Sequence, residues 1–214
     1  NTAVGYKAGD ANQTDNNNTA IGAHVLSNNV VGNCTAVGAN ALTANTTGNN
    51  DAYGVNSLFT NTTGTQNVAF GTSSGFSNTT GNYNTSIGSG AGYYISTGTY
   101  NTSIGRATNQ ETTTGSYNIC IGTSAKPSGA GGSSELVLGN VLTGAGANSF
   151  AFGSTAVGRV YNNFATNASW TRDSDERLKT NITNDTLGLS FIDSLRTVTF
   201  QWKPNNEIPK TFDA

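Results

Sequence analysis

A five-residue phrase returns along this chain at a nearly constant interval. Each copy ends in one large apolar residue and a glycine, as in NTAVG, NTAIG, NVAFG, NTSIG and SFAFG. The closing glycines are Gly5, Gly22, Gly38, Gly54, Gly71, Gly88, Gly105, Gly122, Gly139 and Gly153. Successive glycines are 17, 16, 16, 17, 17, 17, 17, 17 and 14 residues apart. A short fixed period of this kind is typical of solenoids, in which each coil packs only on its neighbours.

The composition favours strands and turns over helices. The chain holds 27 glycines and three prolines, and only 10% of its residues are charged. Between the phrases, NTTG at 45–48, 61–64 and 78–81 provides residues that accept a positive φ. We therefore expect an all-β roll of about ten 17-residue coils, each with two or three short strands. The large residue before each glycine is expected to point into a narrow interior.

Charge divides the chain into two parts. Residues 1–158 hold eight charged side chains, whereas the 44 residues from Thr171 hold thirteen. We expect a β-roll over 1–158, a linker over 159–173 and a second domain over 174–214. The net charge of -2 gives no reason to expect nucleic acid or an anionic membrane as a partner. No apolar run approaches the roughly 20 residues that span a bilayer, so membrane insertion is not expected.

Two further features concern the origin of the chain and its redox chemistry. The chain has no methionine and begins within a repeat phrase, so we expect a piece of a longer product. Cys34 and Cys120 lie about five coils apart, where other coils carry Asn or Ala. We expect both to be small buried residues without an intrachain disulfide.

A roll of such small coils has a thin core, which suggests self-association. Burial of apolar area stabilises by only about 25 cal/mol per Å². Parallel copies could cover the remaining apolar edges, for which we considered Leu42, Leu58, Phe59, Phe76 and Tyr93. We therefore expect an oligomer.

The NTAIG-type phrase, followed by small residues, resembles the head repeats of trimeric autotransporter adhesins and repeats in phage and viral tail fibres. The resemblance covers residues 1 to about 158, although the adhesin heads usually repeat about every 14 residues. It implies a left-handed parallel β-roll. It also implies three copies, since the spacing alone does not choose three over two.

A second resemblance begins where the charge rises. The stretch from Ser169 to Pro204 resembles the start of the C-terminal intramolecular chaperone of endosialidase and other tail spikes. The matching residues are Ser174, Asp175, Arg177, Leu178, Lys179, Asn181 and Ile182. A helix-like LGLSFIDSLRTV and a strand-like TFQWKP follow, which suggests a short α+β segment, truncated at Ala214.

The chaperone resemblance implies that this domain guides trimer assembly and, in many members, cuts itself off. The cut would fall between Ser174 and Asp175. The hydroxyl of Ser174 would attack a neighbouring carbonyl, and Lys179 would take the proton if burial lowers its pKa. This serine–lysine step is a single turnover, and no multiple-turnover enzyme activity is expected.

Histidine, asparagine and tyrosine are further candidates for binding or modification sites. His24 is the only histidine and has no cluster of ligands around it, so no metal or cofactor is expected. Asn-x-Ser/Thr sequences recur, and they indicate either glycosylation or a repeat built of Asn and Thr. Five tyrosines recur on successive coils and either stack sugars or pack in the core or a trimer. They are Tyr83, Tyr93, Tyr94, Tyr100 and Tyr117.

The leading functional hypothesis is a structural and adhesive homotrimeric fibre, a viral tail fibre or spike that attaches to a host-surface glycan or protein. Its expected location is the virion tail or an extracellular surface. The alternative is a bacterial surface trimeric adhesin. A glycan-degrading spike is less favoured because the carboxylates are scattered over distant coils. They are Asp10, Asp15, Asp51, Glu111 and Glu135.

Overall fold

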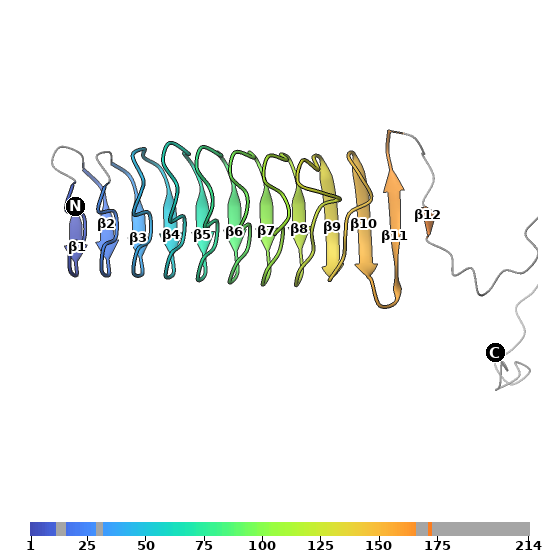
Figure 1. The fold of residues 1–214 in the computed structure, drawn as a ribbon, viewed down its shortest axis with the longest axis horizontal. Helices are drawn as coiled ribbons and strands as arrows, with labels where there is room; N and C mark the ends of the chain where they lie inside the picture. Colours follow the sequence, from blue (N-terminus) through green and yellow to red (C-terminus); the bar gives the residue numbers. More distant parts are fainter. Residues whose placement is uncertain (12–15, 29–31, 166–170, 173–214) are drawn as a thin grey trace, which may run out of the picture. The chain divides into compact units, whose positions relative to one another are not determined.

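The computed structural model describes residues 1–11, 16–28, 32–165 and 171–172. These residues form one β-solenoid and contain no helix. The chain divides into two compact units, Asn1–Asp173 and Ser174–Ala214, and the described residues all lie in the first. Its twelve strands form one sheet in which spatial order follows sequence order, as Figure 1 shows. The strands are β1 (Thr2–Val4), β2 (Thr19–Ile21), β3 (Thr35–Val37), β4 (Asp51–Tyr53), β5 (Val68–Phe70), β6 (Thr85–Ile87), β7 (Thr102–Ile104), β8 (Ile119–Ile121), β9 (Glu135–Asn140), β10 (Ser149–Ser154), β11 (Gly158–Asn163) and β12 (Thr171–Arg172).

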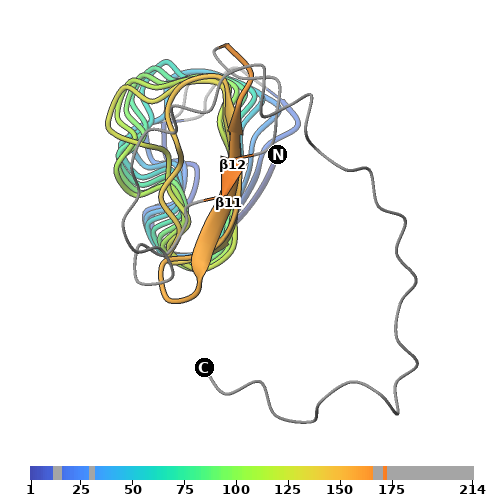
Figure 2. The same cartoon turned by 90° about the vertical axis from the view of Figure 1, so that its right-hand side faces the viewer.

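Strands β1 to β10 pair in parallel, and equivalent positions of the repeat phrase lie side by side. Ala52 of β4 is level with Ala69 of β5, and Ser86 of β6 is level with Ser103 of β7. The 16- or 17-residue coil returns each strand to its predecessor, and this confirms the parallel solenoid with coils of about 17 residues. Seen along the roll in Figure 2, the strands lie on one wall and the connecting turns on the other. The hand of the coil stays a prediction.

The turn wall differs from the expectation of two or three strands per coil. From β1 to β8, each described coil has one three-residue strand. Opposite the strands, the backbone forms turns that contain residues with positive φ, for example Asn56 (φ 57°), Leu58 (φ 47°) and Ser73 (φ 55°). Neighbouring coils still bond through their backbones here, as when the Ser73 N–H donates to the Val55 carbonyl at 2.9 Å. The left-handed residues supply the curvature that two extended strands cannot.

The repeat glycines lie where each strand leaves the sheet. Gly88 has a φ of +125°, and a β-carbon on it would lie 2.6 Å from the carbonyl oxygen of Gly105. A side chain is therefore excluded both by backbone conformation and by the neighbouring coil. The repeat glycines from Gly5 to Gly139 approach the backbone of the following coil closely, and Gly153 approaches β11. The glycine period is thus a packing requirement between coils.

The interior is filled mainly from the turn wall. Leu26, Leu42 and Leu58 are fully buried in the first coils, and Ile95 and Leu142 fill later ones. The expectation that Leu42 and Leu58 are edges awaiting a partner chain is therefore wrong, because each already lies inside its own coil. Phe59, Phe76 and Tyr93 are half-buried and stack on one another, with centroids 5.3 and 4.9 Å apart.

The end of the roll is closed by a change of strand direction. β11 pairs antiparallel with β10, and β12 pairs antiparallel with β11. The stretch 159–173, expected to be a linker, thus contains most of β11 and all of β12. β11 covers the backbone edge that β10 would otherwise leave unpaired.

Candidate functional site

The outward-facing side chains of the sheet form the main candidate surface. In β2 to β8 the middle residue of each strand is buried, and the residues on either side are exposed or half-exposed. The expectation that the large residue before each glycine points inward is wrong. Phe70 is 57% exposed, whereas its neighbour Ala69 is fully buried. The lumen already holds the turn-wall side chains, so a strand can insert only a small residue there.

We call the outward residues of β1 to β10 the outer sheet face. It has two columns, which follow from the strand register. The first column is Thr2, Thr19, Thr35, Asp51, Val68, Thr85, Thr102, Ile119, Leu136 and Phe150. The second column is Val4, Ile21, Val37, Tyr53, Phe70, Ile87, Ile104, Ile121, Leu138 and Phe152. The second column is apolar throughout, and the first becomes apolar from Ile119 onward.

A third column, of exposed tyrosines, borders the first. Tyr83, Tyr100 and Tyr117 each lie two residues before a first-column residue. Their rings stack in sequence with centroids 4.6 and 5.0 Å apart and planes 4° from parallel. The rings cover one another's faces, so sugar stacking is confined to the ends of the stack.

The backbone beneath these tyrosines is left-handed. Tyr83, Tyr100 and Tyr117 have φ of 58°, 57° and 61°, and the equivalent Asn33 and Asn49 have 63° and 62°. Asparagine accepts this conformation readily, whereas for most other residues it costs about 1–2 kcal/mol. Tyrosine therefore occupies this position against its backbone preference, and ring stacking contributes about 0.5–1.5 kcal/mol per pair in compensation.

A hollow lies at the C-terminal end of the outer sheet face. Ser134 takes the place of the next tyrosine, and the uncovered ring of Tyr117 becomes one wall of a cavity of about 490 Å³. Ile119, Leu136 and Phe150 also line it, with Phe164 at its rim. The lining is mostly apolar and aromatic, which suits a hydrophobic side chain better than a charged ligand.

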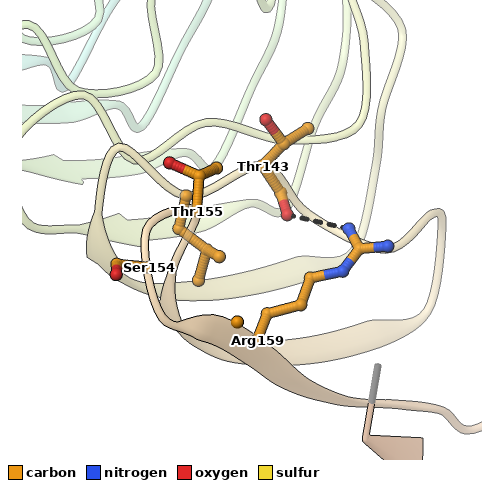
Figure 3. A pocket seen from close by; sticks show the side chains of 6 residues that line it. Thr143, Ser154, Thr155 and Arg159 are labelled. Atoms are coloured by element: carbon orange, nitrogen blue, oxygen red, sulfur yellow. Dashed lines mark hydrogen bonds between the residues drawn. The ribbon is translucent and has the colours of Figure 1, made fainter. Parts of the chain in front are cut away.

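A smaller hollow of about 230 Å³ lies beside the β10–β11 turn (Figure 3). Thr143, Ser154, Thr155 and Arg159 contribute to its lining. The Arg159 guanidinium donates to the Thr143 and Gly144 carbonyls at 3.2 and 3.1 Å, so its role here is to tie neighbouring coils together.

Asparagines form a hydrogen-bonded ladder inside the roll. The Oδ1 atom of each accepts the backbone N–H of the next, at 2.9–3.1 Å. The Nδ2 atom of each donates to a glycine carbonyl 14 residues ahead, as from Asn101 to Gly115 at 2.9 Å. The ladder members are Asn50, Asn67, Asn84, Asn101 and Asn118. A buried side chain that satisfies two backbone groups per coil is a structural requirement.

This burial bears on the two interpretations of the Asn-x-Ser/Thr sequences. Asn45, Asn61, Asn78, Asn84 and Asn101 each begin such a sequence, and all five are buried. The folded roll therefore offers no accessible amide for glycosylation at these five positions, whereas Asn17, which also begins such a sequence, is exposed. The Asn–Thr composition follows from the architecture.

The ladder ends on a buried carboxylate. Glu135 occupies the next ladder position, and its oxygens accept the Ser128 N–H, the Ser128 hydroxyl at 2.6 Å and the Gly146 N–H. Gly132 and Gly144 leave room for it, since a β-carbon on either would clash with a carboxylate oxygen. Glu135 is thus a cap on the ladder. The sequence did not indicate this role for Glu135 among its scattered carboxylates, although an acidic residue in an asparagine position was a visible signal.

The remaining candidate residues have local roles. Cys34 and Cys120 are buried free thiols, as expected. Burial raises the pKa of Cys120 to about 12, with a further contribution from the Glu135 charge. His24 packs edge-on against Tyr6 with centroids 5.2 Å apart.

Across the described ranges, no cluster of three metal-ligating residues occurs, and no helix has the length and hydropathy to cross a membrane.

The residues expected to cut the chain, Ser174, Asp175 and Lys179, lie outside the described residues, as do Asp15 and the helix-like and strand-like segments after Ile182. The cleavage chemistry expected from the sequence therefore stays a prediction.

Comparison with known families agrees with the C-terminal assignment. Residues 174–213 match the model of the family described as chaperone of endosialidase. Neither a curated protein nor a solved structure matches the chain significantly. The chain thus combines a repetitive β-solenoid with a C-terminal segment similar to the endosialidase chaperone, the arrangement expected of a tail-fibre-like protein.

Proposed function

We propose that the chain is part of a homotrimeric fibre of the tail-fibre or tail-spike type, which attaches a virion to its host surface. The observation that carries this proposal is the order of the two parts: a regular β-solenoid precedes a segment that matches the chaperone of endosialidase. The same order favours a location on the virion tail, outside the host cell.

The attachment would depend on repetition. Three copies present three identical sets of surface residues to a glycan or protein receptor. Linked weak contacts gain effective concentration, and avidity can exceed single-site affinity by 10²–10⁴. No deep polar cleft is needed for this mode of binding, which accords with the mostly apolar lining of the hollow beside Tyr117.

The C-terminal segment would guide assembly and then be released. In the proposed step, the Ser174 hydroxyl attacks the carbonyl carbon of the Ser174–Asp175 peptide bond, and Lys179 accepts the hydroxyl proton. The bond from that carbon to the Asp175 nitrogen breaks, Lys179 returns the proton to the nitrogen, which leaves as an amine, and water hydrolyses the resulting ester. Each chain cuts once.

Mass measurements on the natural full-length protein test both parts of this proposal. A native mass of three chains is expected, and a denatured mass ending at Ser174 is expected after maturation. Ser174→Ala should leave the chain uncut while the trimer still forms. A well-behaved monomer would overturn the fibre proposal, and continued cutting in Ser174→Ala would overturn the serine chemistry alone.

A further inference from the structure

We infer that the outer sheet face is the surface through which three copies of this chain pack, with their sheets turned toward a common axis. The inference rests on the proposed homotrimer and adds where its interface lies. The tyrosine column and the hollow beside Tyr117 belong to the same surface.

The first observation is exposed apolar area in a continuous band. Phe70, Ile87, Ile121 and Phe152 of the second column and Tyr117 of the third column are each at least 39% exposed. Soluble monomers rarely expose contiguous apolar patches larger than a few hundred Å², and larger ones mark interaction sites. Exposed apolar residues elsewhere on the described roll, such as Val55 and Tyr94, lie outside these columns.

The second observation is size. Ten parallel strands about 4.8 Å apart make a face roughly 43 Å long, and three alternate residues span about 14 Å across it. The face therefore offers on the order of 600 Å² per copy, close to the roughly 800 Å² that each partner of a standard interface contributes.

The third observation is charge. In the two strand columns, every residue of which is described, Asp51 is the one acidic or basic residue. Identical faces in register then bring like charges together at one coil only, that of Asp51, so repulsion opposes self-association little over the rest of the face. An oppositely charged partner would find little to recognise here, so a second and third copy of this chain fit the face best.

The fourth observation is the repeat itself. Equivalent side chains recur at every coil, so parallel copies in register place each coil beside its counterparts at one height. Both strand columns are apolar at β5, with Val68 and Phe70, and in every coil from Ile119 onward, where the hollow of about 490 Å³ lies. A hydrophobic side chain of a neighbouring copy would fill it. Contact between copies is therefore tightest in the last coils, next in sequence to the chaperone segment.

A matched pair of double variants of the full-length chain tests the location of the interface. Ile87→Lys with Ile121→Lys places two charges on the outer sheet face. Val55→Lys with Tyr94→Lys places two charges at exposed apolar positions outside it, 45% and 51% exposed against 39% for both isoleucines. Native mass and sedimentation should show at least a tenfold rise in the trimer dissociation constant for the face variant only, with the circular dichroism of both unchanged.

Spin labels provide a second readout that does not depend on disruption. A nitroxide on Thr85→Cys, in the first column, should give shorter inter-copy distances than one on Tyr94→Cys, on the turn wall. Cys34 and Cys120 are buried, so the unsubstituted chain serves as the unlabelled control.

The outcomes separate this inference from the proposed function. A monomeric natural protein would overturn both. A trimer that survives the face variant, with shorter distances at Tyr94, would overturn the interface and leave the fibre standing. A face variant that stays trimeric but no longer binds host cells would also overturn it, because the face would then be a receptor site.

Discussion

The Oδ1 atom of Asn118 accepts the backbone N–H of Glu135 at 3.1 Å, and through this bond the asparagine ladder ends on a buried carboxylate. Upstream, each ladder side chain satisfies one N–H and one carbonyl of a neighbouring coil. Glu135 instead accepts three donors, the N–H and hydroxyl of Ser128 before it and the N–H of Gly146 after it. The stability of the roll should therefore depend on these buried side chains more than on its surface charges.

Asn101→Ala tests the ladder. The substitution removes the acceptor of the Asn118 N–H and the donor to the Gly115 carbonyl, at 3.1 and 2.9 Å. Each buried group left without a partner costs about 1–3 kcal/mol. Chemical denaturation of the full chain should show a loss of at least about 2 kcal/mol. Asn140→Ala, at an exposed position, is the control, and an equal loss there would contradict the role of the ladder.

Glu135→Gln tests the cap. Glutamine directs an NH₂ group at a site surrounded by donors, so one buried N–H or hydroxyl loses its acceptor at a cost of about 1–3 kcal/mol. The comparison is Glu111→Gln, which removes an exposed ion pair with Lys126 and should cost less than about 1 kcal/mol. Thermal unfolding of both variants measures the difference. Equal melting temperatures would show that the Glu135 charge has no structural role.

Gly88→Ala tests the glycine column. The added methyl group meets the Gly105 carbonyl in a backbone conformation that L-residues rarely adopt. A strained backbone of this kind costs about 1–3 kcal/mol before any clash is counted. Gly129→Ala introduces the same methyl group where nothing lies within 4 Å. The free energy of unfolding should fall in the first variant and stay within about 0.5 kcal/mol in the second.

Cys120→Ala tests the buried thiol through pH. The folded pKa is about 12, above the ordinary value of 9.0. The unfolded chain therefore loses this proton first as pH rises through 9, and stability falls by up to about 1.4 kcal/mol per pH unit between 9 and 12. Alanine occupies the equivalent position of other strands, and the variant should show a shallower alkaline loss. Parallel stability–pH curves for the two proteins would contradict this.

The period of the glycines predicted the solenoid because each coil must repeat the same close backbone approach to its neighbour. The burial of Cys34 and Cys120 was also predictable, since both stand in columns of Asn or Ala. The resemblance around Ser174 to Ile182 located the chaperone segment, which the family match at 174–213 confirms.

The sequence pattern predicted the wrong side of each strand to face the interior. Large residues before each glycine suggested a core position, but alternation in a three-residue strand buries only the middle residue. The small size of Ala52, Ala69, Ser86 and Cys120 was the signal for a narrow lumen. Leu42 and Leu58 fill that lumen from the other wall, and no spacing rule based on strands would have placed them there.

The sequence by itself determined the coil period, the parallel order of the strands and the boundary of the chaperone segment, because each depends on residues close together in the chain or repeated along it. Only the tertiary structure decided which side of each strand faces water. That choice depends on how much of the lumen the opposite wall has already filled, a volume shared by residues from both walls and from neighbouring coils. The outer sheet face, and with it the proposed contact between copies, follows from that competition for interior space.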